Sequence, residues 1–61
     1  MKRRDLIRHS EAHGCRLLRE GGSHSIYENT QTNKRSSDPR HIEIAEYTTL
    51  KICKQLQIPA P

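Results

Sequence analysis

The sequence contains no phenylalanine and no tryptophan, and Tyr27 and Tyr47 are its only aromatic residues. Aromatic side chains usually supply large amounts of buried apolar area, so the core must be built from leucine, isoleucine, alanine and cysteine. The chain has 61 residues, and 31% of them are hydrophobic. A domain of this size buries only about 60% of the surface that its unfolded chain exposes. We therefore expect residues 1–61 to form a single small domain, which excludes a two-domain enzyme with a deep cleft.

Long apolar runs are also missing. No stretch approaches the ~18 apolar residues of a membrane span, and the basic start at residues 1–4 is not followed by an apolar signal segment. These absences predict a soluble, cytoplasmic chain that does not span a membrane. Cys15 and Cys53 are too few for a disulfide scaffold and too far apart for a CxxC motif. We expect two small buried side chains in a reducing compartment, and a bridge between them only in an oxidising one.

Negative charge is the minority, because eleven lysines and arginines oppose seven aspartates and glutamates, for a net charge of +4. Such a balance favours an anionic partner, which can be nucleic acid, an acidic protein or an anionic membrane surface. If part of the basic array faces one side, it is typical of a surface that binds a phosphate backbone. The alternative is a solvated basic surface. The basic residues cluster as Lys2, Arg3, Arg4 and Arg8, then Arg16 and Arg19, then Lys34, Arg35 and Arg40.

Two segments carry helical patterns. The first, residues 2–13, has no glycine or proline, places Leu6 and Ile7 on one side with Ala12 nearby, and is followed by Gly14 as a helix-ending glycine. The second is predicted over residues 48–57 with Thr48 as its N-cap, and it ends before Pro59, with Ile58 folded back against its end. Its apolar face repeats at i, i+3, i+4 and i+7. That face consists of Thr49, Ile52, Cys53 and Leu56.

Three strands are predicted between the helices. Residues 15–20 and 23–29 read as a hairpin whose turn, Gly21-Gly22, allows positive φ at both positions. Residues 30–34 form a second turn, in which Asn33 tolerates the left-handed region.

The third strand is predicted over residues 35–41, where Pro39 can sit only at an edge or a strand end. The resulting fold class is α+β, in the order α-β-β-β-α. Two helices cover one face of a three-stranded antiparallel sheet.

The tetrapeptide Gly21-Gly22-Ser23-His24 is the best candidate for chemistry. A glycine-rich turn lets the backbone approach an anion closely, and imidazole can both take and give a proton near neutral pH. A structural role for His24 is the alternative. Serine-hydrolase chemistry is set aside, because Ser23 and His24 are neighbours on a predicted strand and should point to opposite faces. Ser23 then serves as a hydroxyl that stabilises the turn.

The other three histidines give weaker evidence of a functional role. His9 and His13 are four residues apart on the first helix, a spacing that can bind a metal, but no third ligand is evident. Two solvated helix histidines are the plainer interpretation. His41 stands at the end of the third strand, where it can reach a site or only a turn.

The chain resembles the HicA family of bacterial toxins over essentially its whole length, and the order of several motifs carries this resemblance. The motifs are Gly21-Gly22-Ser23-His24, the start Arg4-Asp5-Leu6-Ile7, the helix end at Gly14, Pro39-Arg40-His41, and the segment from Ile52 to Ile58. The resemblance implies a fold like that of double-stranded-RNA-binding domains. It also implies an mRNA interferase, an endoribonuclease that inhibits translation and growth, neutralised by a HicB-type antitoxin. Operator DNA would be bound only through the antitoxin complex.

By the same resemblance His24 is the catalytic histidine, as general base or general acid, and no metal or cofactor is implied. RNA can supply its own 2′-OH as nucleophile, which leaves the protein to move protons and stabilise charge. Gly22 and Ser23 shape the turn and can bind the scissile phosphate. Base stacking should be limited, with Tyr27 the one evident platform. Five basic residues are expected to hold the RNA strand: Arg4, Arg8, Arg19, Lys34 and Arg40.

The sequence departs from the family pattern at three places. Ser10 stands where an apolar residue is usual, and burial of an unpaired hydroxyl costs about 1–3 kcal/mol. Asp38 and two preceding serines replace a more apolar approach to Pro39, and Gln57 replaces a frequent helix-ending glycine. These departures predict lower stability without altering the His24 motif. The alternative function is a non-catalytic RNA-binding or protein-interaction module of the same fold.

Overall fold

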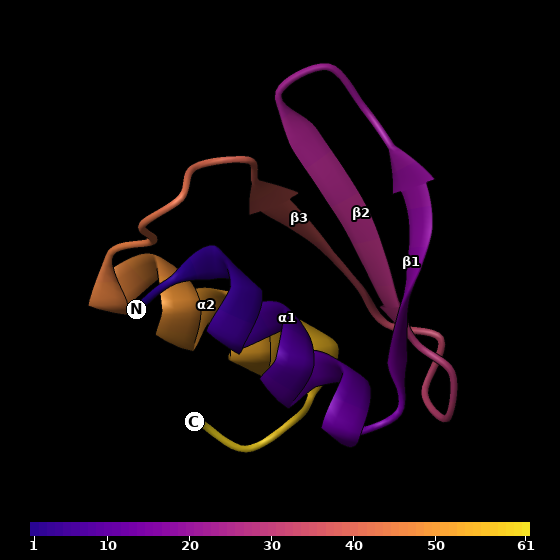
Figure 1. The fold of residues 1–61 in the computed structure, drawn as a ribbon. Helices are drawn as coiled ribbons and strands as arrows, with labels where there is room; N and C mark the ends of the chain where they lie inside the picture. The colour runs from indigo at the N-terminus through magenta and orange to yellow at the C-terminus, as the bar shows by residue number, and fades with distance from the viewer.

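The computed structural model describes residues 1–61 and confirms the α-β-β-β-α order (Figure 1). The helices are α1 (Arg3–Ala12) and α2 (Glu46–Leu56), and the strands are β1 (Cys15–Glu20), β2 (His24–Asn29) and β3 (Arg35–Pro39). All five predicted elements match to within two residues at each end. Neither helix is long and apolar enough to cross a membrane.

The sheet is antiparallel with the strand order β1-β2-β3, so each strand pairs with its neighbour in the chain. Both helices pack on the same side of it, and the turn between β1 and β2 projects beyond them (Figure 1). Along β2 the buried residues Ser25, Tyr27 and Asn29 face the helices. The alternation of a strand places His24 on the opposite, open face. The register shifts between Leu17 and Arg19, which marks a bulge in β1.

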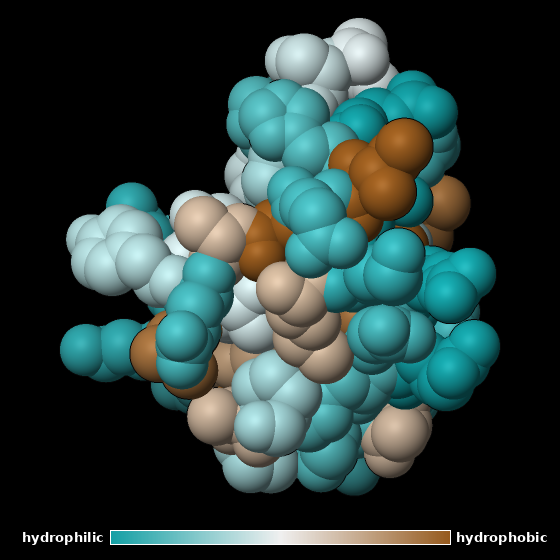
Figure 2. All heavy atoms as spheres, turned by 60° about the vertical axis from the view of Figure 1, so that its left-hand side comes forward, coloured by the Kyte–Doolittle hydropathy of each residue, from teal (hydrophilic) through white to brown (hydrophobic).

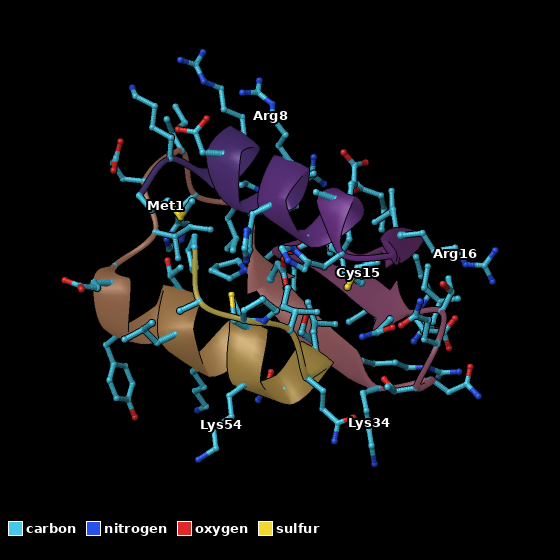
Figure 3. All side chains as sticks on the ribbon, turned by 90° about the horizontal axis from the view of Figure 1, so that it is seen from below. Met1, Arg8, Cys15, Arg16, Lys34 and Lys54 are labelled. Atoms are coloured by element: carbon cyan, nitrogen blue, oxygen red, sulfur yellow. The ribbon has the colours of Figure 1, made fainter.

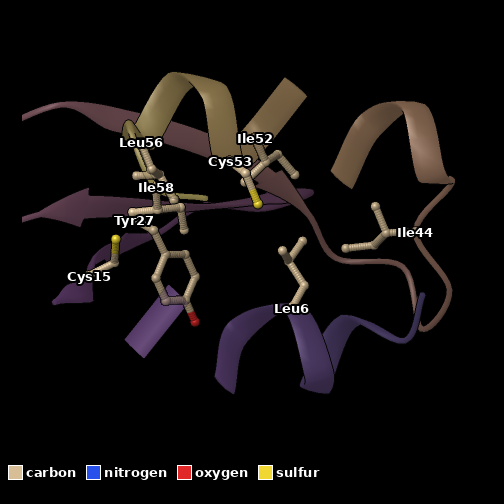
Figure 4. Close-up of a cluster of buried hydrophobic side chains, with 8 residues drawn as sticks. All are labelled: Leu6, Cys15, Tyr27, Ile44, Ile52, Cys53, Leu56 and Ile58. Carbon is tan, nitrogen blue, oxygen red and sulfur yellow. The ribbon is translucent and has the colours of Figure 1, made fainter. Parts of the chain in front are cut away.

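The core is a cluster of eight buried side chains between the sheet and the helices (Figure 4). Leu6 of α1 and Leu56 of α2 are fully buried, and each such side chain stabilises the fold by about 1.5–3 kcal/mol. Both cysteines are free and buried, as predicted. Tyr27 also belongs to the core, so it offers no stacking platform, whereas Tyr47 is 76% exposed. The cluster consists of Leu6, Cys15, Tyr27, Ile44, Ile52, Cys53, Leu56 and Ile58.

The buried face of α1 differs from the prediction in two ways. Ala12 is exposed, whereas Ser10 is fully buried and takes the core position in its place. Its hydroxyl is not unpaired, because Ser10 Oγ donates to the Leu6 carbonyl at 3.0 Å. A serine bonded to the carbonyl four residues earlier satisfies itself within its own helix. The predicted penalty for an unpaired hydroxyl therefore does not apply.

The start of α2 was wrongly predicted. The helix begins at Glu46, its N-cap is Ala45, and no side chain caps it, so Thr48 lies inside the helix. The chain just before the helix is fixed by pairing with the N-terminal segment. Ile44 N–H donates to the Met1 carbonyl at 2.8 Å, and the backbones of Lys2 and Glu43 form an isolated antiparallel β-bridge. This tertiary anchor replaces a side-chain cap. The predicted apolar face is confirmed, since all four of its residues are buried.

Three residues adopt positive φ, all at ends or turns. Gly14 follows α1 with φ 84°, Asn33 has φ 61° in the second turn, and Gln57 ends α2 with φ 59°. The first two were predicted. Gln57 takes the left-handed conformation that glycine adopts most easily, so α2 ends in this conformation without a glycine.

The third strand is shorter than predicted and polar on its buried side. It ends at Pro39 on the sheet edge, so Arg40 and His41 lie beyond it. Ser36 and Asp38 are buried, while Arg35 and Ser37 are exposed. The strand therefore alternates with period two, although none of its inward residues is apolar. Figure 2 shows a surface dominated by hydrophilic residues, with hydrophobic spheres in separate small patches.

Candidate functional site

The turn that presents His24 is closed by one backbone hydrogen bond. Gly21 N–H donates to the His24 carbonyl at 2.8 Å. A Cβ on Gly21 would lie 2.9 Å from that carbonyl oxygen, whereas one on Gly22 would meet nothing within 4 Å. The predicted positive φ is wrong, because neither glycine adopts it. Gly21 is required by close approach of the backbone, and Gly22 keeps the outer side of the turn open.

The imidazole of His24 is exposed and is held by its neighbour. Ser23 Oγ lies 3.1 Å from His24 Nδ1, within hydrogen-bond distance. The prediction that these two side chains point apart is wrong, because β2 begins at His24 and the alternation of a strand does not extend to Ser23. The contact uses Nδ1, so Nε2 is the ring nitrogen that can face a ligand. Ser23 thus helps to orient the imidazole.

Arg40 connects this turn to the end of β3. Its backbone N–H donates to the Ser23 carbonyl at 3.2 Å, and its guanidinium Nη1 donates to the Gly21 carbonyl at 3.4 Å. The same Nη1 lies 3.2 Å from Glu20 Oε2. Arg40 therefore stabilises the turn with its backbone and places a cation beside it.

A chain of polar contacts continues behind the turn. Ser25 Oγ donates to Glu20 Oε1 at 2.9 Å and accepts from Arg3 Nη2 at 3.0 Å. Ser25 is fully buried, so this chain links the start of α1 to the end of β1 through the interior. Arg3 Nε is also buried but has no partner.

A basic pocket of about 320 Å³ lies between α1 and the segment after β3. Four of its five lining residues are cations, and Arg40 is common to this pocket and the turn. Guanidinium groups match the geometry of phosphate oxygens, and they keep their charge at any physiological pH. The arrangement is suited to a phosphate group next to the Gly21–His24 turn. The lining residues are Lys2, Arg3, Arg4, Arg40 and Ile42.

A second basic pocket, of about 540 Å³, lies along β3 and includes Ile26 of β2. It is lined by Arg19, Lys34 and Arg35 together with polar residues. Glu28 neutralises part of this region, since its carboxylate lies 3.3 Å from Arg35 Nε and 3.7 Å from Arg16 Nη2. The open face of the sheet is therefore basic on the strands that flank β2.

The structure divides the predicted RNA-binding arginines and lysines among three places. Arg4 and Arg40 line the first pocket, and Arg19 and Lys34 line the second pocket. Arg8 belongs to neither, since it is paired with Asp5 at 3.8 Å and projects from α1 on the side opposite Lys34 (Figure 3). Lys2, Arg3, Glu20 and Arg35 were not among the predicted site residues. Their charge was visible, but their positions depend on strand register and helix packing.

Burial controls the titratable groups of the interior. Burial raises the pKa of Asp38, against a smaller opposite effect of the Ser36 hydroxyl and of Arg3. Ser36 Oγ donates to Asp38 Oδ1 at 2.7 Å, whereas Asp38 Oδ2 has no partner. Burial also raises the pKa of both thiols, Cys15 and Cys53, which makes them poor nucleophiles.

His9 of α1 and His13, the residue that follows α1, contact the protein's own carbonyls. His9 Nε2 lies 2.7 Å from the Pro59 carbonyl oxygen, and His13 Nδ1 lies 3.0 Å from the His9 carbonyl oxygen. No three His, Cys, Asp or Glu side chains come together as a group that could hold a metal ion. His41 is exposed. His9 and His13 therefore contribute to the fold of the helix end rather than to the His24 turn.

Residues 3–58 match the family model described as HicA toxin of bacterial toxin-antitoxin. The match begins at the first residue of α1 and ends two residues beyond α2, so it includes every helix and strand. No curated protein and no solved structure matches the chain.

Proposed function

Because the chain belongs to the HicA family of bacterial toxins, we propose that it is an endoribonuclease that cleaves mRNA through His24. Membership makes the chain the toxin of a toxin–antitoxin pair. The observation that best supports ribonuclease activity is the position of His24, which is exposed on a projecting turn and held at Nδ1 by Ser23. The guanidinium of Arg40 lies against the Gly21 carbonyl of the same turn. A site this shallow is sufficient when the substrate supplies its own nucleophile.

In the proposed reaction a ribose 2′-oxygen attacks the adjacent phosphorus, so a P–O2′ bond forms and the P–O5′ bond breaks. The 2′-hydroxyl loses a proton, and the departing 5′-oxygen gains one. His24 carries out one of these two proton transfers through Nε2, because Nδ1 faces Ser23 Oγ at 3.1 Å. The reaction as written needs no metal ion or cofactor.

Charge on the reacting phosphate is stabilised by the residues around the turn. Arg40 supplies a guanidinium, and the unobstructed backbone at Gly22 allows a phosphate oxygen to approach. The strand then extends into the pocket that contains Arg4 and across the open face toward Arg19 and Lys34. Since Tyr27 is buried, recognition depends on backbone charge and shape rather than on stacked bases.

The antitoxin partner is proposed to be of the HicB type. Both basic pockets favour a partner with an acidic surface, and a protein bound over the turn would exclude RNA from His24. We assign any contact with operator DNA to the antitoxin and the action of the toxin to the cytoplasm. Expression of the chain alone should arrest growth, and coexpression of the antitoxin should restore it. Unimpaired growth with the folded chain would contradict the toxin's proposed activity.

Cleavage of RNA by purified His24 variants tests the catalytic proposal. His24→Ala and His24→Gln should each reduce the rate by about 10²- to 10⁴-fold, the usual contribution of one positioned proton-transfer group. Circular dichroism and thermal unfolding should show little change, because His24 is exposed. His13→Ala is the matched control, since that histidine is also exposed but contacts the His9 carbonyl at the end of α1. Wild-type cleavage by His24→Ala would rule out His24 as the catalytic group.

A further inference from the structure

The carboxylate of Glu20 occupies a position among cationic and hydroxyl donors beside the His24 turn. Its Oε2 lies 3.2 Å from Arg40 Nη1, and its Oε1 accepts from Ser25 Oγ at 2.9 Å. Ser25 Oγ in turn accepts from Arg3 Nη2 at 3.0 Å. One carboxylate therefore binds Arg40 directly and reaches Arg3 through one hydroxyl. Both arginines line the basic pocket.

The donors that hold this carboxylate are those that would hold a phosphate. Guanidinium and hydroxyl groups bind the oxygens of carboxylates and phosphates with the same geometry. The side chains of Glu20 and Arg40 are 47% and 48% exposed, and ion pairs at such exposure are weak and screened by salt. The carboxylate can therefore be displaced without disturbing the core.

We propose that Glu20 is an internal competitor of the substrate, whose carboxylate occupies the site that a phosphate of bound RNA takes next to the Gly21–His24 turn. In the free protein Arg40 is paired with Glu20, and on binding Arg40 transfers to the RNA phosphate while Glu20 turns to solvent. This inference rests on the proposed RNA substrate and adds a regulatory element to the same site.

Competition of this kind lowers the apparent affinity for every anion by the fraction of molecules in which Arg40 is free. A ligand with several phosphates recovers the loss through contacts in the second pocket, whereas a mononucleotide does not. Glu20 thus lowers the occupancy of the site by the abundant small phosphates of a cell, while RNA that binds both pockets still fills it.

Glu20→Gln is the direct test, because the amide keeps an oxygen acceptor for Ser25 Oγ and removes the charge. The probe is a fluorescein-labelled, mixed-sequence single-stranded RNA, measured by anisotropy in a His24→Ala background so that cleavage does not interfere. Affinity should rise by about two- to fivefold at low salt, the range set by an exposed ion pair. Glu11→Gln makes the same change in net charge on the exposed face of α1 and controls for it.

The second variant is Arg40→Gln, which should weaken binding and abolish the gain from Glu20→Gln when the two are combined. An equal gain from Glu11→Gln, a gain that persists without Arg40, or no RNA binding by any variant would each overturn the competitor role. Cleavage by the wild type is measured separately. If the wild type cleaves RNA but Glu20→Gln binds RNA no more tightly, the proposed function stands and the competitor role of Glu20 is wrong. If the wild type does not cleave RNA but Glu20→Gln binds it more tightly, the competitor role stands and the proposed function is wrong.

Discussion

The two ends of β2 differ in whether the buried polar groups around them have hydrogen-bond partners. At the Asn29 end, the side-chain Nδ2 donates to the Leu56 carbonyl at 2.8 Å, and Oδ1 accepts from Gln31 N–H at 2.9 Å. At the His24 end, Asp38 pairs with Ser25 in register, but Asp38 Oδ2 and Arg3 Nε are buried without a partner. One end is fully hydrogen-bonded, and the other is not.

This difference separates the part of the strand that holds the fold from the part that carries the candidate site. Asn29 ties the sheet to the end of α2, next to the core residue Leu56. His24, by contrast, stands over a polar interior whose charges are incompletely paired, and such interiors lower stability. Functional sites commonly sacrifice stability in this way. Substitutions at the two ends should therefore affect different properties.

The largest effect on stability is expected at the Asn29 end. Asn29→Ala removes two hydrogen bonds and leaves the Leu56 carbonyl buried without a donor, which should cost about 1–3 kcal/mol. Chemical denaturation measures the loss. The cleavage rate per folded molecule should remain that of the wild type, since the site is at the other end of the strand. If Asn29→Ala keeps wild-type stability but cleaves RNA more slowly, the proposed separation of stability and activity between the two ends of β2 is wrong.

A smaller effect, on catalysis rather than stability, is expected at Ser23. Ser23→Ala removes the hydroxyl that lies 3.1 Å from His24 Nδ1 and should lower kcat about tenfold, which corresponds to ~1.4 kcal/mol. KM and the unfolding midpoint should change little, because Ser23 is exposed. Ser23→Thr retains a hydroxyl and should restore most of the rate. Equal losses in both variants would show that the hydroxyl does not orient His24.

The smallest effect is expected at Asp38 and depends on pH. Burial raises the pKa of Asp38 above its ordinary value of 3.8, so the folded protein retains this proton to higher pH than the unfolded chain does. Stability contributed by the protonated form is therefore lost as pH rises through the raised pKa. Asp38→Asn does not titrate and should gain on the order of 1 kcal/mol at neutral pH.

Thermal unfolding of the wild type and Asp38→Asn across the acid-to-neutral range measures this effect. The stability of the variant relative to the wild type should increase as pH rises, while Ser37→Ala, an exposed change on the same strand, should not alter the pH dependence. A constant difference between Asp38→Asn and the wild type would mean that Asp38 does not titrate differently in the folded state.

Much of the fold was predictable because its signals are local. The spacing of Thr49, Ile52, Cys53 and Leu56 defines one helical face, and Gly14 and Asn33 mark positions of positive φ. The start of α2 was not predictable from cap residues, because pairing of residues 1–2 with residues 43–44 fixes it from across the molecule. Buried polar residues such as Ser10 and Asp38 are also missed by counting apolar positions.

The candidate site was predictable only in part, for the same reason. His24 is marked by the glycines before it, and these remain adjacent in any structure. Glu20 and Arg3 meet at Ser25 only because Glu20 pairs with Ser25 across the hairpin and α1 lies beneath both. Sequence spacing gives no measure of such contacts, since the register of β1 changes at its bulge.

The strand order β1-β2-β3 also has a consequence for the timing of toxicity. Every strand pairs with its neighbour in the chain, so the sheet closes short loops, and topologies rich in such local contacts fold quickly. We expect a newly synthesised chain to become folded soon after it leaves the ribosome, and stopped-flow refolding slower than seconds would contradict this. Protection of the cell then depends on antitoxin that is already present when the toxin is made.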